Sequence, residues 1–352
     1  MEQTKRLYSF DLLRILAAFS VVVLHATAQR WYDLPLESTD WFLTNAINVL
    51  SRFGVPIFVM LSGALFLSKD RLLSTKRLWT HYILRLFILY AVWSFLYGTL
   101  GYLTLHPEVY SVKDYLKCIL SGHYHLWYLP MMIGIYALVP LLRRMVHACT
   151  RKELEYFLLL FVIFEVLFTT VRVFVKTPQV LSLMDSFNIP MVCSYLGYFI
   201  LGHYLTQYEL SKIVDRMLAI LFPVCMVVNV VVSAMQSRKE GVPMSEFTNS
   251  FGLFTFLMTV AIFRFFYKNE NAKRIYFEKH KTLGQFVLSL SKSTLGIYLI
   301  HLAIMESKLV SPLFGIMNPV LAALVALVIC FVLSAVLATL LRKIPVVGRY
   351  LC

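Results

Sequence analysis

Ten apolar runs, each long enough to cross a membrane, constrain this chain more than any other feature of its sequence. A helix needs about 20 mostly apolar residues to span the hydrocarbon core of a bilayer. The chain is 59% hydrophobic and only 15% charged, whereas a soluble domain is about 25% charged. We therefore predict an all-α, polytopic membrane helical bundle of about ten transmembrane helices, in which residues 1–352 form a single transmembrane domain. The expected spans cover approximately residues 8–28, 45–67, 80–103, 126–142, 154–174, 189–207, 213–234, 247–266, 286–306 and 316–341.

The basic residues between these runs predict how the chain is oriented. The net charge is +14, and excess Lys and Arg in short loops normally marks the cytoplasmic side. With the N-terminus placed inside, 20 Lys and Arg fall in inner loops and 7 in outer loops. We therefore predict that both termini are cytoplasmic, which an even number of spans also requires. The net positive charge is then explained by basic residues in the inner loops of a protein embedded in membrane lipid. No feature of the sequence predicts nucleic-acid binding.

Two further features narrow the class of protein. Segment 112–120 is too short and too polar to span, so we expect an interfacial helix between the third and fourth spans. The six cysteines form no Cys-x-x-Cys pair, and the chain lacks the spacings of zinc sites and of Gly-rich nucleotide-binding loops. We expect no metal and no tightly bound cofactor.

Ionisable residues inside the first span are the most informative, because charged side chains in hydrocarbon cost a few kcal/mol each. Asp11 and Arg14 are three residues apart and share a helix face. Arg14 and His25 are eleven residues apart, so they lie on one stripe, separated by about 16 Å along the axis. The alternative is a purely structural role, in which the Arg14 side chain extends to the inner membrane interface and His25 hydrogen-bonds to a neighbouring helix.

Four motifs, in order along nearly the whole chain, resemble the acyltransferase 3 family of integral membrane acyltransferases. The first is "FDLLRILAAFSVVVLH", in which Asp and Arg are followed after ten residues by His. The others are "FGVPIFVMLSGALFL", "HLWYLPMMIGIYALVPLL" and "SKSTLGIYLIHLAI". The chain departs from the family where Arg85 stands alone, where Ile88 replaces an expected Pro, and where Ala64 follows Ser-Gly.

This resemblance implies transfer of an acyl group, usually acetyl, from cytoplasmic acyl-CoA. The acceptor would be a hydroxyl or amine of a cell-surface carbohydrate or a related, lipid-linked molecule. The protein would then be an O-acetyltransferase that uses acetyl-CoA as its donor substrate, in the cytoplasmic membrane of a bacterium.

The stripe on the first span suggests how such a transfer would proceed. Arg14 would hold a donor phosphate or polarise the thioester, and Asp11 would orient Arg14. His25 would act as general base on the acceptor or accept the acyl group transiently. We predict these three residues as catalytic.

Further candidates each have a structural alternative. Donor contacts are predicted at Arg85, Ser62 and Gly63, although Arg85 could reach the interface and small residues commonly serve helix contacts. Acceptor contacts are predicted at five residues, which could instead form an aromatic belt or helix–helix hydrogen bonds. The five are His125, Trp127, Tyr128, Tyr298 and His301, with His123 nearby.

Two weaker signals and one rival function remain. Glu165 and Arg172 are seven residues apart and are expected to share a face near the acceptor. The basic run Lys268–Lys281 is expected to be a solvated loop that sets topology, or a site that attracts CoA phosphates or anionic lipid. The rival is a transporter or flippase for a lipid-linked sugar or small solute, but we find no inverted repeat typical of transporters.

Overall fold

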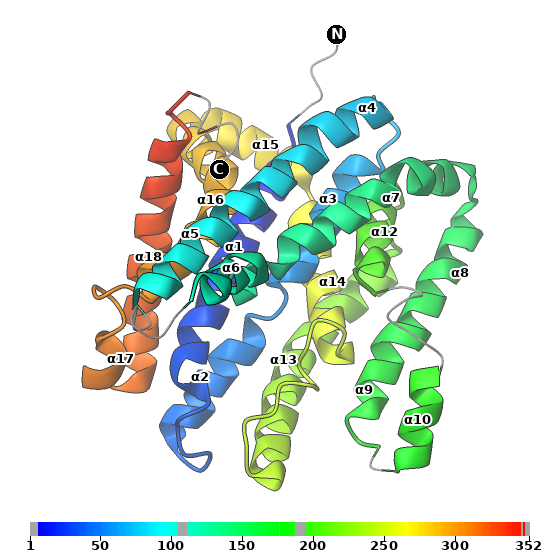
Figure 1. The fold of residues 1–352 in the computed structure, drawn as a ribbon. Helices are drawn as coiled ribbons and strands as arrows, with labels where there is room; N and C mark the ends of the chain where they lie inside the picture. The colour runs from blue at the N-terminus through cyan, green and yellow to red at the C-terminus, as the bar shows by residue number, and fades with distance from the viewer. Residues whose placement is uncertain (1–5, 105–110, 176, 187–193, 346–347, 349–352) are drawn as a thin grey trace.

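The structure is a computed structural model that describes residues 6–104, 111–175, 177–186, 194–345 and 348. Helices form every regular element of these residues, and they pack into one bundle (Figure 1). The elements are α1 (Tyr8–Trp31), α2 (Thr39–Leu50), α3 (Gly54–Phe66), α4 (Thr75–Arg77), η1 (Leu78–Ile83), α5 (Leu84–Thr104), α6 (Val112–Ser121), η2 (Tyr124–Trp127), α7 (Tyr128–Ala148), α8 (Arg151–Phe161), η3 (Val162–Leu167), α9 (Phe168–Arg172), α10 (Pro178–Ser186), α12 (Ser194–Gln207), α13 (Lys212–Glu240), α14 (Leu253–Tyr267), α15 (Glu270–Lys279), α16 (Lys281–Met305), α17 (Leu313–Ile316) and α18 (Pro319–Leu341).

Eight helical stretches of the described residues are long and apolar enough to cross a membrane. They are Tyr8–Trp31, Thr39–Phe66, Thr75–Gly101, Tyr124–Ala148, Arg151–Arg172, Lys212–Glu240, Lys281–Met305 and Pro319–Leu341. The protein is therefore a polytopic helical membrane protein, as its sequence predicts. Eight of the ten predicted runs coincide with these stretches.

The sixth and eighth predicted runs are not among these eight stretches: the sixth lies partly outside the described residues, and the eighth corresponds to a shorter apolar helix. Helix α12 has 14 residues, and residues 187–193 of the predicted run lie outside the described part. Helix α14 has 15 residues because residues 247–252 form a turn, in which Gly252 approaches the Phe247 carbonyl oxygen. Helix α14 and the described part of α12 are both largely buried against neighbouring helices.

The two ends of the bundle agree with the predicted grouping of loops. Helix α1 begins and α18 ends at the same end of the bundle, where α4 and α15 also lie (Figure 1). We call this the N-terminal end. The turns α1–α2, α13–α14 and α16–α17 lie at the opposite end. This arrangement is the one expected if both termini lie on the same side of the membrane. That this side is the cytoplasmic one remains a prediction.

The polar segment 112–120 forms a helix as predicted, and it packs against α5 rather than standing alone. Helix α6 begins with a capping box between Ser111 and Asp114, which satisfies two free backbone N–H groups. Hydrogen bonds from the Ser111 hydroxyl and backbone lower the pKa of Asp114 below its ordinary value. Gly98 of α5 makes the close approach possible, because a Cβ there would lie 2.9 Å from Ile119 Cα.

A remote carboxylate caps helix α1 at its N-terminus. The N-cap residue Leu7 offers no side-chain acceptor. Instead, Glu270 of α15 accepts hydrogen bonds from the backbone N–H groups of Tyr8, at 2.7 Å, and Ser9, at 2.8 Å. The Ser9 hydroxyl donates to the same carboxylate. The negative charge also complements the positive end of the α1 dipole.

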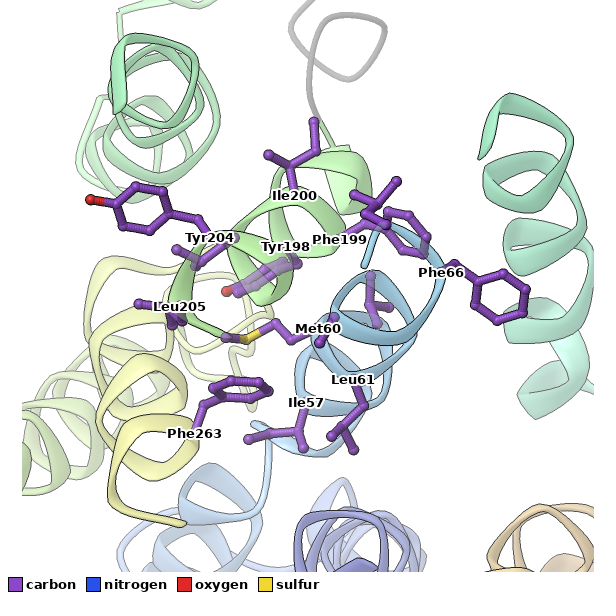
Figure 2. Close-up of a cluster of buried hydrophobic side chains, with 14 of the residues drawn as sticks. Ile57, Met60, Leu61, Phe66, Tyr198, Phe199, Ile200, Tyr204, Leu205 and Phe263 are labelled. Atoms are coloured by element: carbon purple, nitrogen blue, oxygen red, sulfur yellow. The ribbon is translucent and has the colours of Figure 1, made fainter. Parts of the chain in front are cut away.

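Helices α3 and α12 cross at two reciprocal glycines. A Cβ on Gly63 would lie 1.7 Å from the Phe199 carbonyl oxygen, and a Cβ on Gly202 would lie 1.9 Å from that of Met60. The two backbones are therefore in contact. In a membrane, such close packing drives helix association, because lipid removes the hydrophobic driving force between helices. Figure 2 shows the side chains that interleave around this crossing, including Tyr198 and Phe263.

This crossing predicts that Gly63→Ala destabilises the protein. The added methyl group has no space beside the Phe199 carbonyl, so the helices must separate at a cost of about 1–3 kcal/mol. Thermal unfolding in detergent should show a lower midpoint. Gly134→Ala in α7 is the matched control, since nothing lies within 4 Å of a Cβ there. Equal midpoints for the two variants would contradict this account of the crossing.

The remote cap predicts that Glu270→Ala loosens the start of α1. Two backbone donors and one hydroxyl lose their acceptor, which should cost about 1–2 kcal/mol. Hydrogen exchange of the Tyr8 and Ser9 amides should accelerate. Glu278→Ala removes a carboxylate of the same helix that pairs with Arg274 and is 64% exposed, so it should leave both amides protected.

Candidate active site

Asp11 and Arg14 form an ion pair near the N-terminal end of α1. The Arg14 Nη1 atom lies 3.3 Å from Asp11 Oδ1. Asp11 also accepts hydrogen bonds from Arg6 Nε, at 2.8 Å, and from the Ser291 hydroxyl, at 2.6 Å. Its side chain is only 7% exposed, whereas that of Arg14 is 30% exposed. Asp11 is thus fixed by three donors, while part of the Arg14 guanidinium remains open to a ligand.

Aromatic and hydroxyl side chains of η1, α3 and α7 form a second layer at this depth of the bundle. The Tyr136 hydroxyl donates to Ser62 Oγ at 3.4 Å, and its ring centroid lies 4.4 Å from that of Phe66. Phe66 in turn packs against Tyr82 and carries the Arg71 guanidinium over its ring. Tyr136 and Arg71 are both close enough to Arg14 to interact with it electrostatically.

The predicted donor residues are therefore not equivalent in the structure. Ser62 belongs to the layer beside Tyr136, whereas Gly63 faces the backbone of α12. The helix contact accounts for Gly63, and its part in donor binding stays a prediction. Arg85 is half-buried at the second residue of α5.

A histidine cluster surrounds His25, nearer the opposite end of α1. The ring centroid of His301 in α16 lies 5.2 Å from that of His25 and 5.6 Å from that of His125. The Tyr124 hydroxyl lies 3.5 Å from His25 Nδ1. His125 and His301 are buried, whereas His25 is partly exposed. The structure thus brings His25 together with two of the five predicted acceptor residues.

Of the other three predicted acceptor residues, two join this cluster and one lies apart. The Tyr298 hydroxyl donates to the backbone carbonyl of His125. The Tyr128 ring lies 5.6 Å from that of Tyr298, between centroids. Trp127 is 45% exposed and packs on Tyr195 of α12 instead.

Sequence reasoning missed three residues of the cluster. Tyr97 of α5 donates to the Leu299 carbonyl, at 2.8 Å, and accepts from the Ala303 amide, at 3.0 Å. Tyr124 contacts His25, and Glu306 at the end of α16 contacts His123. The alternation His-Tyr-His at 123–125 was a visible signal for Tyr124, but nothing local marked Tyr97 or Glu306.

Comparison with known families decides the class of the protein. The acyltransferase 3 family, described as an acyltransferase domain, matches residues 7–339. The chain belongs to this family. The comparisons with curated proteins and with solved structures gave no match. The chain is thus a multi-pass membrane acyltransferase, and the match spans every residue of the two clusters just described except Arg6.

Two weaker expectations for this acyltransferase need correction. Glu165 and Arg172 do not share one environment, since Glu165 is buried and Arg172 is exposed. The π-helical segment η3 includes Glu165 and ends before Arg172. The basic run Lys268–Lys281 is largely the helix α15 rather than a loop, and partial burial lowers the pKa of Lys273.

A cationic cavity of about 420 Å³ opens at the N-terminal end of the acyltransferase, between α7 and the start of α4. Arg143, Arg144 and His147 line it together with Ser74 and Thr75. Arg143 already donates to three backbone carbonyls at the end of α3 and in the loop that follows it, whereas Arg144 is exposed. Arg143 follows Tyr136 by seven residues, or about two helical turns.

The chemistry available to the acyltransferase follows from these groups. Arg14 offers a charged donor for an anion or a carbonyl oxygen, and imidazoles offer bases that suit neutral pH. Among the described residues, no group of three or more His, Cys, Asp or Glu is arranged to hold a metal ion.

Proposed function

We propose that this acyltransferase moves an acyl group, normally acetyl, from acyl-CoA at its N-terminal end to an acceptor at the opposite end. The acceptor is a hydroxyl or amine of a cell-surface carbohydrate or a lipid-linked relative. The N-terminal end faces the cytoplasm of a bacterial cell. One observation carries the proposal: Arg14 and His25 lie on one stripe of α1, about 16 Å apart, and each has a cluster of polar and aromatic groups around it.

The donor end is supported by its charge. CoA carries several phosphate charges, and Arg14, the partly open member of the Asp11 ion pair, can bond a phosphate or the thioester oxygen. The cavity lined by Arg143, Arg144 and His147 offers further positive charge at the same end of the bundle. Arg85, Ser62 and Gly63 remain proposed donor contacts, of which Ser62 has the most direct support.

The acceptor end is supported by its bases. His25 takes the proton of the acceptor hydroxyl or amine while the acceptor oxygen or nitrogen bonds to the acyl carbon. The bond from that carbon to sulfur breaks, and the CoA thiolate leaves and takes up a proton. In the other form of this mechanism, His25 first receives the acyl group and then passes it on.

The acceptor pocket is proposed from the neighbours of His25. His301 packs directly against the His25 ring, His125 packs against His301, and Tyr298 and Tyr128 follow behind His125. Trp127, which faces Tyr195 rather than the cluster, would contact only a larger acceptor that extends toward α12.

Removal of the base should abolish transfer. We expect His25→Ala to lower the turnover of purified protein with radiolabelled acetyl-CoA by about 100-fold or more, while the thermal midpoint in detergent stays close to wild type. His280→Ala, an exposed histidine at the start of α16, is the control and should keep full turnover. Near-normal turnover of His25→Ala would refute the assignment. Solute movement without acyl transfer by the wild type would favour the transporter instead.

Removal of the Arg14 charge should weaken the donor side. Hydrogen bonds to charged groups contribute about 1.5–3 kcal/mol, so Arg14→Gln should lower kcat/KM for acyl-CoA by about 10–100-fold. Arg14→Lys should recover only part of this, because an ammonium lacks the planar fork. Arg238→Gln at the opposite end, where the arginine pairs with Glu37, should leave kcat/KM unchanged. An Arg14→Gln enzyme with normal kcat/KM would remove Arg14 from the mechanism.

A further inference from the structure

A second cavity, of about 670 Å³, lies on a side of the bundle that the proposed acyl transfer does not use. Helices α13 and α14 form most of its wall, and Leu16 of α1 and two residues at the junction of α2 and α3, Leu50 and Phe53, complete it. Leu16 follows Arg14 by two residues, which is about 200° around the helix. The cavity therefore lies on a different face of α1 from the stripe that carries the predicted catalytic residues.

The cavity has the length of about one membrane leaflet. Asp215, Phe222 and Met226 line it from α13 at intervals of seven and four residues, so they share one face of that helix. Eleven residues separate Asp215 from Met226, or about 16 Å along the axis. On α14, the lining runs from Met258 to Lys268, or about 15 Å. The hydrocarbon core of a bilayer is about 30 Å thick, so this wall covers about half of it.

The charged groups of the cavity are gathered at one end. Asp215 pairs with Arg264 Nη2, at 3.2 Å, and with Lys268 Nζ, at 3.3 Å. Two cations on one carboxylate leave a net positive charge. The Arg264 side chain is only 10% exposed, whereas that of Lys268 is 52% exposed, so the Lys268 ammonium can meet a second anion. This end is the N-terminal end of the bundle, where α15 follows α14 directly (Figure 1).

The rest of the cavity is apolar and opens sideways. All the other lining side chains are apolar. Ala219 of α13 is exposed, and Phe265 of α14 is 76% exposed, so the wall reaches the surface that faces surrounding lipid. A polar solute would find few hydrogen-bond partners here, whereas a hydrocarbon chain would find contacts along the whole length.

We propose that this cavity binds an anionic phospholipid from the leaflet at the N-terminal end of the bundle. The phosphate lies at Lys268, and one acyl chain runs between α13 and α14. Basic groups beside an opening between membrane helices are the usual recognition element for anionic headgroups. A zwitterionic lipid carries its own cation next to the phosphate, so it gains less from the net positive charge. The proposal does not depend on the acyl-transfer reaction.

The first test removes the charge at the opening. Phosphatidylglycerol is titrated into the purified protein in detergent, and bound lipid is measured by native mass spectrometry. We expect Lys268→Gln to weaken phosphatidylglycerol binding by about 5-fold, the contribution of one Lys near an anionic headgroup. Lys279→Gln is the control, because this exposed lysine belongs to the same basic run but does not line the cavity. Equal affinities of Lys268→Gln and Lys279→Gln would overturn the proposal, as would equal affinities of the wild type for phosphatidylglycerol and phosphatidylcholine.

The second test fills the apolar part. Ala219→Trp places an indole in the cavity and should abolish phosphatidylglycerol binding. Ala91→Trp on α5 is the control, since Ala91 is also exposed but lies on a helix that does not line the cavity. Unchanged binding by Ala219→Trp would refute an acyl chain between α13 and α14. Inorganic phosphate separates a lipid from a free anion: if it raises the thermal midpoint of the wild type as much as phosphatidylglycerol does, the site does not recognise lipid.

Discussion

The buried carboxylate of Asp11 is the constraint around which the bundle is arranged. A charge in hydrocarbon costs a few kcal/mol unless partners compensate it, and Asp11 receives hydrogen bonds from Arg6, Arg14 and Ser291. These donors come from the segment before α1, from α1 itself and from α16. The Ser291 hydrogen bond requires α1 and α16 to pack side by side, and the same packing places His301 beside His25. The Arg14 region and the His25 region of the site therefore both lie along the same pair of helices, α1 and α16.

Close packing elsewhere keeps this arrangement rigid. The crossing of α3 and α12 at Gly63 and Gly202 leaves no room for a side chain, and Glu270 of α15 fixes the first turn of α1. Neither contact involves a large hydrophobic effect, because lipid is as apolar as the core. Backbone contact and satisfied hydrogen bonds stabilise these helices in the way that burial of apolar surface stabilises soluble proteins. The Glu270 cap fixes α1, which carries Asp11, Arg14 and His25, at its first turn.

The site divides into a cationic part and an imidazole part. Membership of the acyltransferase 3 family gives the class of chemistry, and the geometry suggests how it is distributed. Arg14 stands in a layer of tyrosine, serine and arginine side chains, whereas His25 stands among three further histidines. An acyl group bound at one part and an acceptor bound at the other would meet along one face of α1. The exposed Glu306 contacts His123 of the imidazole part.

Local patterns in the sequence were enough to predict the class of fold, the positions of eight spans, the shared stripe of Asp11, Arg14 and His25, and the family. Hydropathy and helical spacing act within single segments, so they can be read without knowing which helices meet. The three-dimensional arrangement was needed to show that α14 is shorter than a full span, that Glu165 is buried while Arg172 is exposed, and that Glu306 reaches the histidine cluster. These features depend on which helices approach one another, and contacts between residues far apart in the chain leave no local pattern.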